Sequence, residues 1–182
     1  MNAEEALKSG NLDDAFADLQ GRVRKEPADA ALRVFLFQLL VLLGQWERAL
    51  TQLKVAGELD AANLAMVNTY REALQCEAFR TRVFAGERDP LLLGDPGQWM
   101  ALLVEALRLG AQDRVAQSRE MRAQAFELAP STSGNIDGKR FDWIADADQR
   151  LGPVLEAIVN GRYYWVPFQS IRTLLVEAPT DL

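Results

Sequence analysis

Three aspartates that lie close together are the residues of this chain whose type and spacing could do chemistry. A single residue separates Asp146 from Asp148, which places both carboxylates on one side of an extended segment, and Asp142 lies just before them. Hard divalent cations prefer several carboxylate oxygens, so a metal-dependent enzyme that uses Asp142, Asp146 and Asp148 is one hypothesis. The alternatives are structural, with Asp148 capping a turn and Arg150 pairing with an aspartate, or contact with a partner.

The composition argues against most of the chemistry that such a cluster would serve. The chain has no histidine, which removes Ser–His and Cys–His nucleophile systems and most zinc sites. It also lacks a glycine-rich phosphate-binding loop and the spacing of a calcium loop. The single cysteine, Cys76, lies in a helical pattern and is expected to be a small core residue, which fits a reducing cytoplasm. We therefore expect no catalytic residue, no cofactor and no tightly held metal.

The charge balance excludes two classes of partner. Acidic residues outnumber basic ones by 26 to 20, for a net charge of −6. Nucleic acids and anionic membrane surfaces both require a basic face, so neither is an expected partner. The longest apolar run, Val34 to Leu43, is too short to span a bilayer and predicts a buried helix instead.

The segment around the aspartates predicts a small mixed module. Apolar and acidic residues alternate from Phe141 to Ala147, which predicts a half-buried strand. Trp143 falls on its apolar side, and we expect it to be buried against Leu155 or Ile158. These two residues belong to a predicted helix that opens at Gly152-Pro153 and stops at Asn160-Gly161.

Two further elements complete the predicted module. The aromatic and β-branched residues from Tyr163 to Phe168 predict a strand that is an edge strand or ends at Pro167. Ile171 to Val176 predicts a third strand or a short helix.

Part of this module resembles a known family. The stretches FDWIADADQRLGPVLE and NGRYYWVPF, between Phe141 and Phe168, resemble the signature of the ImpE/TagJ family, accessory proteins of bacterial type VI secretion systems. The resemblance implies a non-enzymatic, cytoplasmic adaptor that binds the N-terminal helix of the small sheath subunit. In some systems it implies action alongside the AAA+ ATPase that recycles the contracted sheath. Family members run on beyond Leu182, so we expect the C-terminal module to be incomplete.

The first half of the chain contains an internal repeat. Glycine, a large apolar residue, alanine and leucine recur with an offset of 34 positions. The pairs are Gly10 and Gly44, Leu12 and Trp46, Ala15 and Ala49, and Leu19 and Leu53. This is the tetratricopeptide period, in which the glycine ends one helix and the alanine lets two helices approach closely.

Further helical patterns extend the array to Pro130. Amphipathic helices are predicted over residues 62–84, 98–109 and 111–129, with proline and glycine between them. A stretch rich in turn formers, residues 131–138, then marks a boundary. The predicted fold is mainly α: a tetratricopeptide-like helical domain over residues 1–130, without any sheet, followed by a small α+β module over residues 131–182.

Peptide binding is the function that this architecture predicts. Paired helices form grooves that accept an amphipathic helix, and large aromatic residues are frequent binding anchors. We expect the groove on the helical array, with contacts from the apolar helix and its following glycine turn. The aromatic cluster near the C-terminus either supplies a further binding anchor or, as the favoured alternative, covers the predicted helix Pro153–Asn160 or the end of the helical array. The candidate residues are Phe35, Leu39, Trp46, Tyr164 and Trp165. A generic peptide-binding repeat protein outside secretion is the remaining alternative and differs only in its partner.

Overall fold

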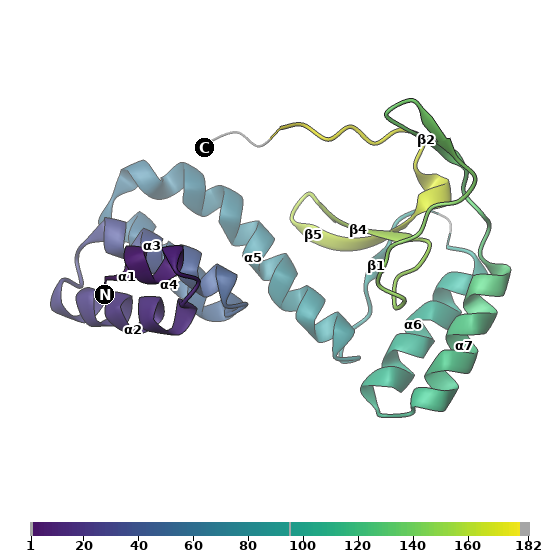
Figure 1. The fold of residues 1–182 in the computed structure, drawn as a ribbon, viewed down its shortest axis with the longest axis horizontal. Helices are drawn as coiled ribbons and strands as arrows, with labels where there is room; N and C mark the ends of the chain where they lie inside the picture. Colours follow the sequence, from purple (N-terminus) through teal and green to yellow (C-terminus); the bar gives the residue numbers. More distant parts are fainter. Residues whose placement is uncertain (1, 95, 179–182) are drawn as a thin grey trace. The chain divides into compact units, whose positions relative to one another are not determined.

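The computed structural model describes residues 2–94 and 96–178, which form two compact units (Figure 1). The first unit ends at Ala78 and the second begins at Phe79, so the division falls inside helix α5 (Leu64–Phe84). This division does not coincide with the boundary predicted between residues 130 and 131, because the helices over residues 98–111 and 115–128 belong to the same unit as the C-terminal strands. A separable domain that ends at residue 130 stays a prediction. No helix of the described chain is long and apolar enough to cross a membrane.

The first unit consists of short helices joined by tight turns. Its elements are α1 (Ala3–Lys8), α2 (Leu12–Lys25), α3 (Ala30–Leu42), α4 (Trp46–Leu59), the 3-10 turn η1 (Ala61–Asn63) and the first part of α5. The side chains of Asn2, Asn11 and Asp29 accept backbone N–H hydrogen bonds at the starts of α1, α2 and α3. Gly10 and Gly44 adopt φ of 77° and 66°, a conformation that favours glycine, and turn the chain after α1 and α3.

The predicted helical repeat is confirmed by the core of this unit. Ala15 and Ala49 are both completely buried, so small residues lie where neighbouring helices approach closely. Leu19 and Leu53, one helical turn further on, are also completely buried. The offset of 34 positions therefore places equivalent residues in equivalent core positions of α2 and α4.

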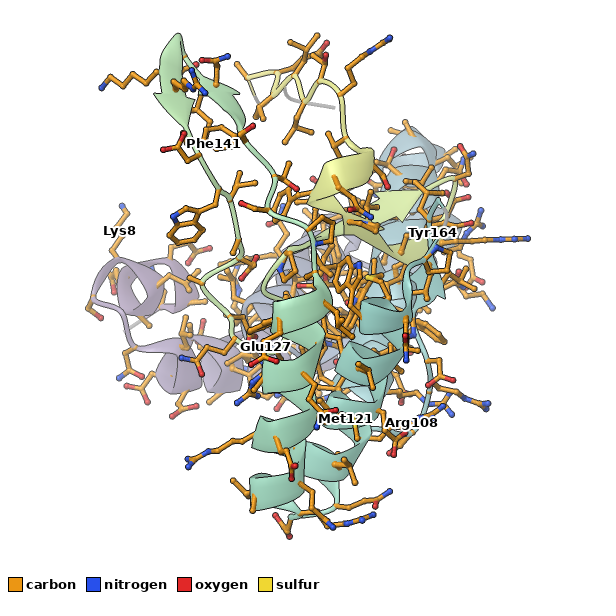
Figure 2. All side chains as sticks on the ribbon, turned by 90° about the vertical axis from the view of Figure 1, so that its right-hand side faces the viewer. Lys8, Arg108, Met121, Glu127, Phe141 and Tyr164 are labelled. Atoms are coloured by element: carbon orange, nitrogen blue, oxygen red, sulfur yellow. The ribbon has the colours of Figure 1, made fainter. Side chains whose placement is uncertain are left out.

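The second unit combines a helical hairpin with a small sheet. After the end of α5 come β1 (Leu91–Leu92), α6 (Gln98–Ala111), α7 (Val115–Leu128), β2 (Gly134–Ile136), β3 (Lys139–Phe141), β4 (Val154–Val159), β5 (Arg162–Pro167) and the 3-10 turn η2 (Phe168–Ser170). Helices α6 and α7 run side by side in opposite directions (Figure 2). One sheet has the strand order β1-β5-β4, and β2 and β3 form a separate hairpin.

The helix predicted from Gly152-Pro153 to Asn160 is wrong: these residues form strand β4. It pairs with β5 in an antiparallel hairpin, with Val159 opposite Arg162. Asn160 and Gly161 adopt φ of 50° and 69°, as the two central residues of a tight hairpin turn require. Val154, Ile158 and Val159 are β-branched and therefore favour a strand. This preference outweighs the helical spacing of the apolar residues on which the prediction rested.

Three other predictions about strands need correction, and a fourth, on β5, is met in one of its two alternatives. Residues 1–130 contain one short strand, because β1 pairs in parallel with β5. Strand β5 ends at Pro167 as predicted, but it is the central strand of its sheet. Of the strand predicted over residues 141–147, only Phe141 lies in a strand, at the end of β3. Residues 171–178 form neither a strand nor a helix, and Leu174, Leu175 and Val176 are exposed.

A polar cluster joins the end of α5 to the β4–β5 hairpin. Arg80 donates two hydrogen bonds to Glu156, from Nε at 2.6 Å and from Nη2 at 2.9 Å. The hydroxyl of Tyr163 donates to the same carboxylate, and the indole Nε1 of Trp165 donates to that hydroxyl at 2.8 Å. Burial and the bond to Glu156 raise the pKa of Tyr163 well above its usual range, which keeps the hydroxyl protonated. The cluster thus satisfies the polar groups of two buried aromatic side chains.

We predict that Tyr163→Phe lowers the free energy of unfolding by about 1–3 kcal/mol, because it leaves the buried indole N–H of Trp165 without its acceptor. The measurement is urea-induced unfolding followed by tryptophan fluorescence. Tyr164→Phe is the matched control: Tyr164 is half-buried, no hydrogen bond of its hydroxyl occurs among the described residues, and we expect a change within about 0.5 kcal/mol. Equal losses in the two variants would contradict the role of the cluster.

Candidate functional site

The three aspartates do not converge on a common point. Asp142 is exposed. Asp146 accepts the backbone N–H of Asp148 through Oδ1 at 2.7 Å, and Asp148 accepts the backbone N–H of Arg150 at 2.9 Å. The guanidinium of Arg150 also donates to both carboxylate oxygens of Asp148, at 2.6–3.0 Å. In the structure, Asp146 and Asp148 therefore shape the turn that leads to β4.

The described residues contain no group of three or more histidine, cysteine, aspartate or glutamate side chains that could hold a metal ion. The hydrogen bond and charge of Arg150 hold the pKa of Asp148 below its usual range. This arrangement matches the structural alternative for the cluster, in which Asp148 caps a turn and pairs with Arg150. Cys76 is buried, as predicted, and burial raises the pKa of its thiol.

The five candidate partner-binding residues occupy different environments. Leu39 is 1% exposed and Trp165 is completely buried, so both side chains belong to the core and offer no surface to a partner. Phe35 and Trp46 are half-buried against the core of the first unit, and Tyr164 is half-buried in the sheet of the second. A contact role for Phe35, Trp46 and Tyr164 stays a prediction.

The first unit exposes several large apolar side chains besides the five candidates. Leu42 follows Phe35 and Leu39 along one face of α3 and is 66% exposed. On α5, Leu64 is 49% exposed and Tyr70 is 41% exposed, with the Tyr70 ring 5.6 Å from that of Phe37 on α3. Because α3 has few polar residues, its composition predicts that all of its faces are covered. Only the tertiary packing shows which face of the helix remains exposed.

Trp143 is exposed, against the prediction that it is buried. Its side chain is 69% exposed and lies at an apolar hollow of about 240 Å³ in the second unit. The hollow also includes Phe126, Pro130, Ile144 and Pro153. The prediction failed because β4 is a strand and not a helix, so no helical face is available to cover the indole. Trp143 is therefore a possible contact residue that alternation along the chain did not identify.

Two family models match this chain. A model described as ImpE protein matches residues 138–182, and a model described as Tetratricopeptide repeat matches residues 6–73. The first match covers β4 and β5, and the second covers the helix pairs of the first unit and the beginning of α5.

Relatives match along the whole chain. The chain is 55% identical over 182 residues to the type VI secretion system accessory component TagJ of Pseudomonas aeruginosa strain PAO1. All of the chain takes part in this match, and it spans 65% of the length of that relative. It is also similar to the crystal structure of protein VPA1032 from Vibrio parahaemolyticus, with a TM-score of 0.88 and 27% identity, over 99% of this chain and 68% of that one.

The exposure of Trp143 predicts that it contributes little to stability. Trp143→Ala should lower the free energy of unfolding by less than about 1 kcal/mol, whereas Trp165→Ala, which empties a fully buried site, should cost about 3–5 kcal/mol. Urea-induced unfolding of both variants tests the difference. A loss of several kcal/mol in Trp143→Ala would mean that the indole is covered in solution.

The pair formed by Asp148 and Arg150 predicts a specific pH dependence. Because the pKa of Asp148 is lower in the folded chain, its contribution to stability is present above the ordinary aspartate pKa of about 3.9 and is lost as the pH falls through the folded value. We therefore expect Asp148→Asn to flatten the decline of stability in acid. Unfolding midpoints measured from neutral pH to about pH 3 test this, with the exposed Asp142→Asn as control. Parallel curves for the wild type and Asp148→Asn would contradict it.

Proposed function

We propose that this chain is a member of the ImpE/TagJ family and a non-enzymatic accessory protein of a bacterial type VI secretion system, because it is 55% identical to TagJ and matches the ImpE model over residues 138–182. We further propose that it binds the N-terminal helix of the small sheath subunit in the cytoplasm. The AAA+ ATPase that recycles the contracted sheath is a second proposed partner. The observation that supports the accessory role is the 55% identity to TagJ along the whole chain.

The chemistry of the first unit supports a helical partner. Tetratricopeptide-type helix pairs present one side of the array as a groove, and an amphipathic helix buries its apolar anchors in such a groove. Leu42 lies on α3 and Tyr70 lies on α5, and both side chains are exposed. Half-buried Phe35 lies on the same face of α3 as Leu42. These residues supply apolar surface for the proposed contact.

The proposed contact is mainly apolar. Each buried anchor of leucine size contributes about 1.5–3 kcal/mol before the cost of association is subtracted. The chain is acidic without a long run of one sign, so Coulomb attraction is not expected to dominate at this face. The affinity for the sheath helix should therefore depend only weakly on salt.

The test is a calorimetric titration of the chain with a peptide that copies the N-terminal helix of the small sheath subunit. We expect Leu42→Glu to weaken binding by roughly tenfold or more, since it places a charge in the apolar contact. Leu59→Glu is the matched control, because Leu59 is also exposed but lies on α4, the second helix of its pair.

Three outcomes would change the proposal. A loss of binding in Leu59→Glu and none in Leu42→Glu would move the contact to the other face of the array. A loss in Trp143→Ala alone would move it to the second unit. No binding of the peptide by the wild-type chain would reject the sheath helix as the partner and leave the family membership intact.

A further inference from the structure

The second unit contains a hollow of about 390 Å³ beside the helical hairpin, and its charge is opposite to that of the chain as a whole. Its apolar walls come from Phe84 at the end of α5 and from residues on both helices of the hairpin, including Leu103, Leu107 and Val115. Leu103 and Leu107 are buried, whereas Val115 is 52% exposed. The hollow therefore has a firm apolar floor and an open side along α7.

Every charged side chain that lines the hollow is an arginine: Arg119, Arg122 and Arg150. Arg150 is already paired with Asp148 at 2.6 Å, and its guanidinium carbon lies 4.4 Å from the centre of the Phe84 ring. Arg119 and Arg122 differ, because no carboxylate of the described chain lies within ion-pair distance of either guanidinium. They are separated by three positions on α7, so their side chains neighbour each other on one face of the helix.

The positive charge of the hollow contrasts with the chain as a whole, which carries a net charge of −6. Some arginines elsewhere in the described chain are paired with carboxylates, as in Arg22 with Glu4 and Arg108 with Asp89, so they are less available to a ligand than Arg119 and Arg122. Two unpaired guanidiniums beside apolar surface favour a ligand that presents a carboxylate next to an apolar group, since charge-assisted hydrogen bonds strengthen where water is partly excluded.

We propose that this hollow is a second docking site, which takes a segment of a protein partner with an apolar side chain flanked by carboxylates. The apolar side chain enters the floor formed by Leu103 and Leu107, beside Val115 at the rim, and the carboxylates pair with Arg119 and Arg122. The site is separate from the apolar face of the first unit, and it does not depend on the proposed binding of the sheath helix.

The openness of the hollow favours a protein segment over a free small molecule. Small-molecule sites usually bury most of their ligand, whereas here Val115 and Arg119 lie exposed at the rim, along α7. A partner segment that runs along α7 can place the residues that do not enter the hollow on this open side. The residues of α7 that line the hollow, at positions 115, 118, 119 and 122, are three or four positions apart and so lie on one face of the helix. Such a face suits contact with another helix.

The probe is a short fluorescent helical peptide of alanine, leucine and glutamate, with each glutamate three or four positions from a leucine. Fluorescence anisotropy measures its binding to the full chain. We expect saturable binding that weakens strongly between about 0.05 and about 0.5 M NaCl, in contrast to the weak salt dependence expected for the sheath helix. The same peptide with glutamine in place of glutamate should bind at least about tenfold more weakly.

Variants of the rim locate the binding. Arg119→Glu combined with Arg122→Glu should reduce the affinity for the glutamate peptide by roughly tenfold or more, and should increase the affinity for a peptide with lysine in place of glutamate. The matched control is Arg88→Glu combined with Arg172→Glu, which makes the same change of net charge at exposed positions outside the hollow. Val115→Asp, which places a carboxylate at the exposed apolar rim of the hollow, should also weaken binding. Circular dichroism and the melting temperature verify that each variant is folded.

The proposal is overturned if the wild-type chain does not bind the glutamate peptide, or if the two double variants bind it equally. It is also overturned if the glutamine peptide binds as tightly as the glutamate peptide. Dodecanoate is the second arm: if it binds through Arg119 and Arg122 while the peptide does not bind, the hollow takes free amphipathic carboxylates and is not a docking site for proteins. All of these outcomes are independent of the titration with the sheath helix.

Discussion

The ion pair between Arg80 and Glu156 is the interaction on which the second unit depends. It joins the last turns of α5 to the β4–β5 hairpin, although the two residues are 76 positions apart in the chain. The pair is bidentate, so it fixes both the distance and the orientation of the hairpin relative to the helix end. Tyr163 and Trp165 complete the cluster through hydrogen bonds, which allows two large aromatic side chains to be buried without leaving polar groups unsatisfied.

The same contact organises the surface around it. The guanidinium carbons of Arg80 and Arg150 lie 4.6 and 4.4 Å from the centre of the Phe84 ring, so both arginines make cation–π contacts with it. Arg150 in turn is oriented by Asp148, in the turn that leads to β4. The aspartates that suggested a metal site in the sequence therefore help to position Arg150, which lines the hollow together with Arg119 and Arg122 (the cationic hollow). The carboxylates act on a neighbouring arginine and on backbone N–H groups.

The two units present surfaces of different chemistry. The first offers exposed leucine and tyrosine side chains on α3 and α5, where burial of apolar area would drive association. The second offers arginines beside an apolar floor, where charge complementarity would add selectivity and salt dependence. In the proposed accessory role, two such surfaces would allow two partners to be distinguished by their chemistry. The common requirement is that each partner brings an apolar anchor, because both surfaces are lined mainly by apolar side chains.

The sequence by itself determined the helical repeat, because its signals are local and periodic: Gly10 and Gly44 end helices, and Ala15 and Ala49 lie where helices touch. It also offered a turn cap by Asp148 as one of several alternatives, since that bond spans only two residues, and the structure shows this cap. Only the tertiary structure decided the rest. The apolar spacing of residues 154–159 suits a helix or a strand, and pairing with β5 selected the strand. That choice left Trp143 exposed and placed Trp165 in the core. The cationic hollow likewise gathers Phe84, Arg119, Arg122 and Arg150 from three distant parts of the chain, and no spacing within a single segment encodes a contact of that kind.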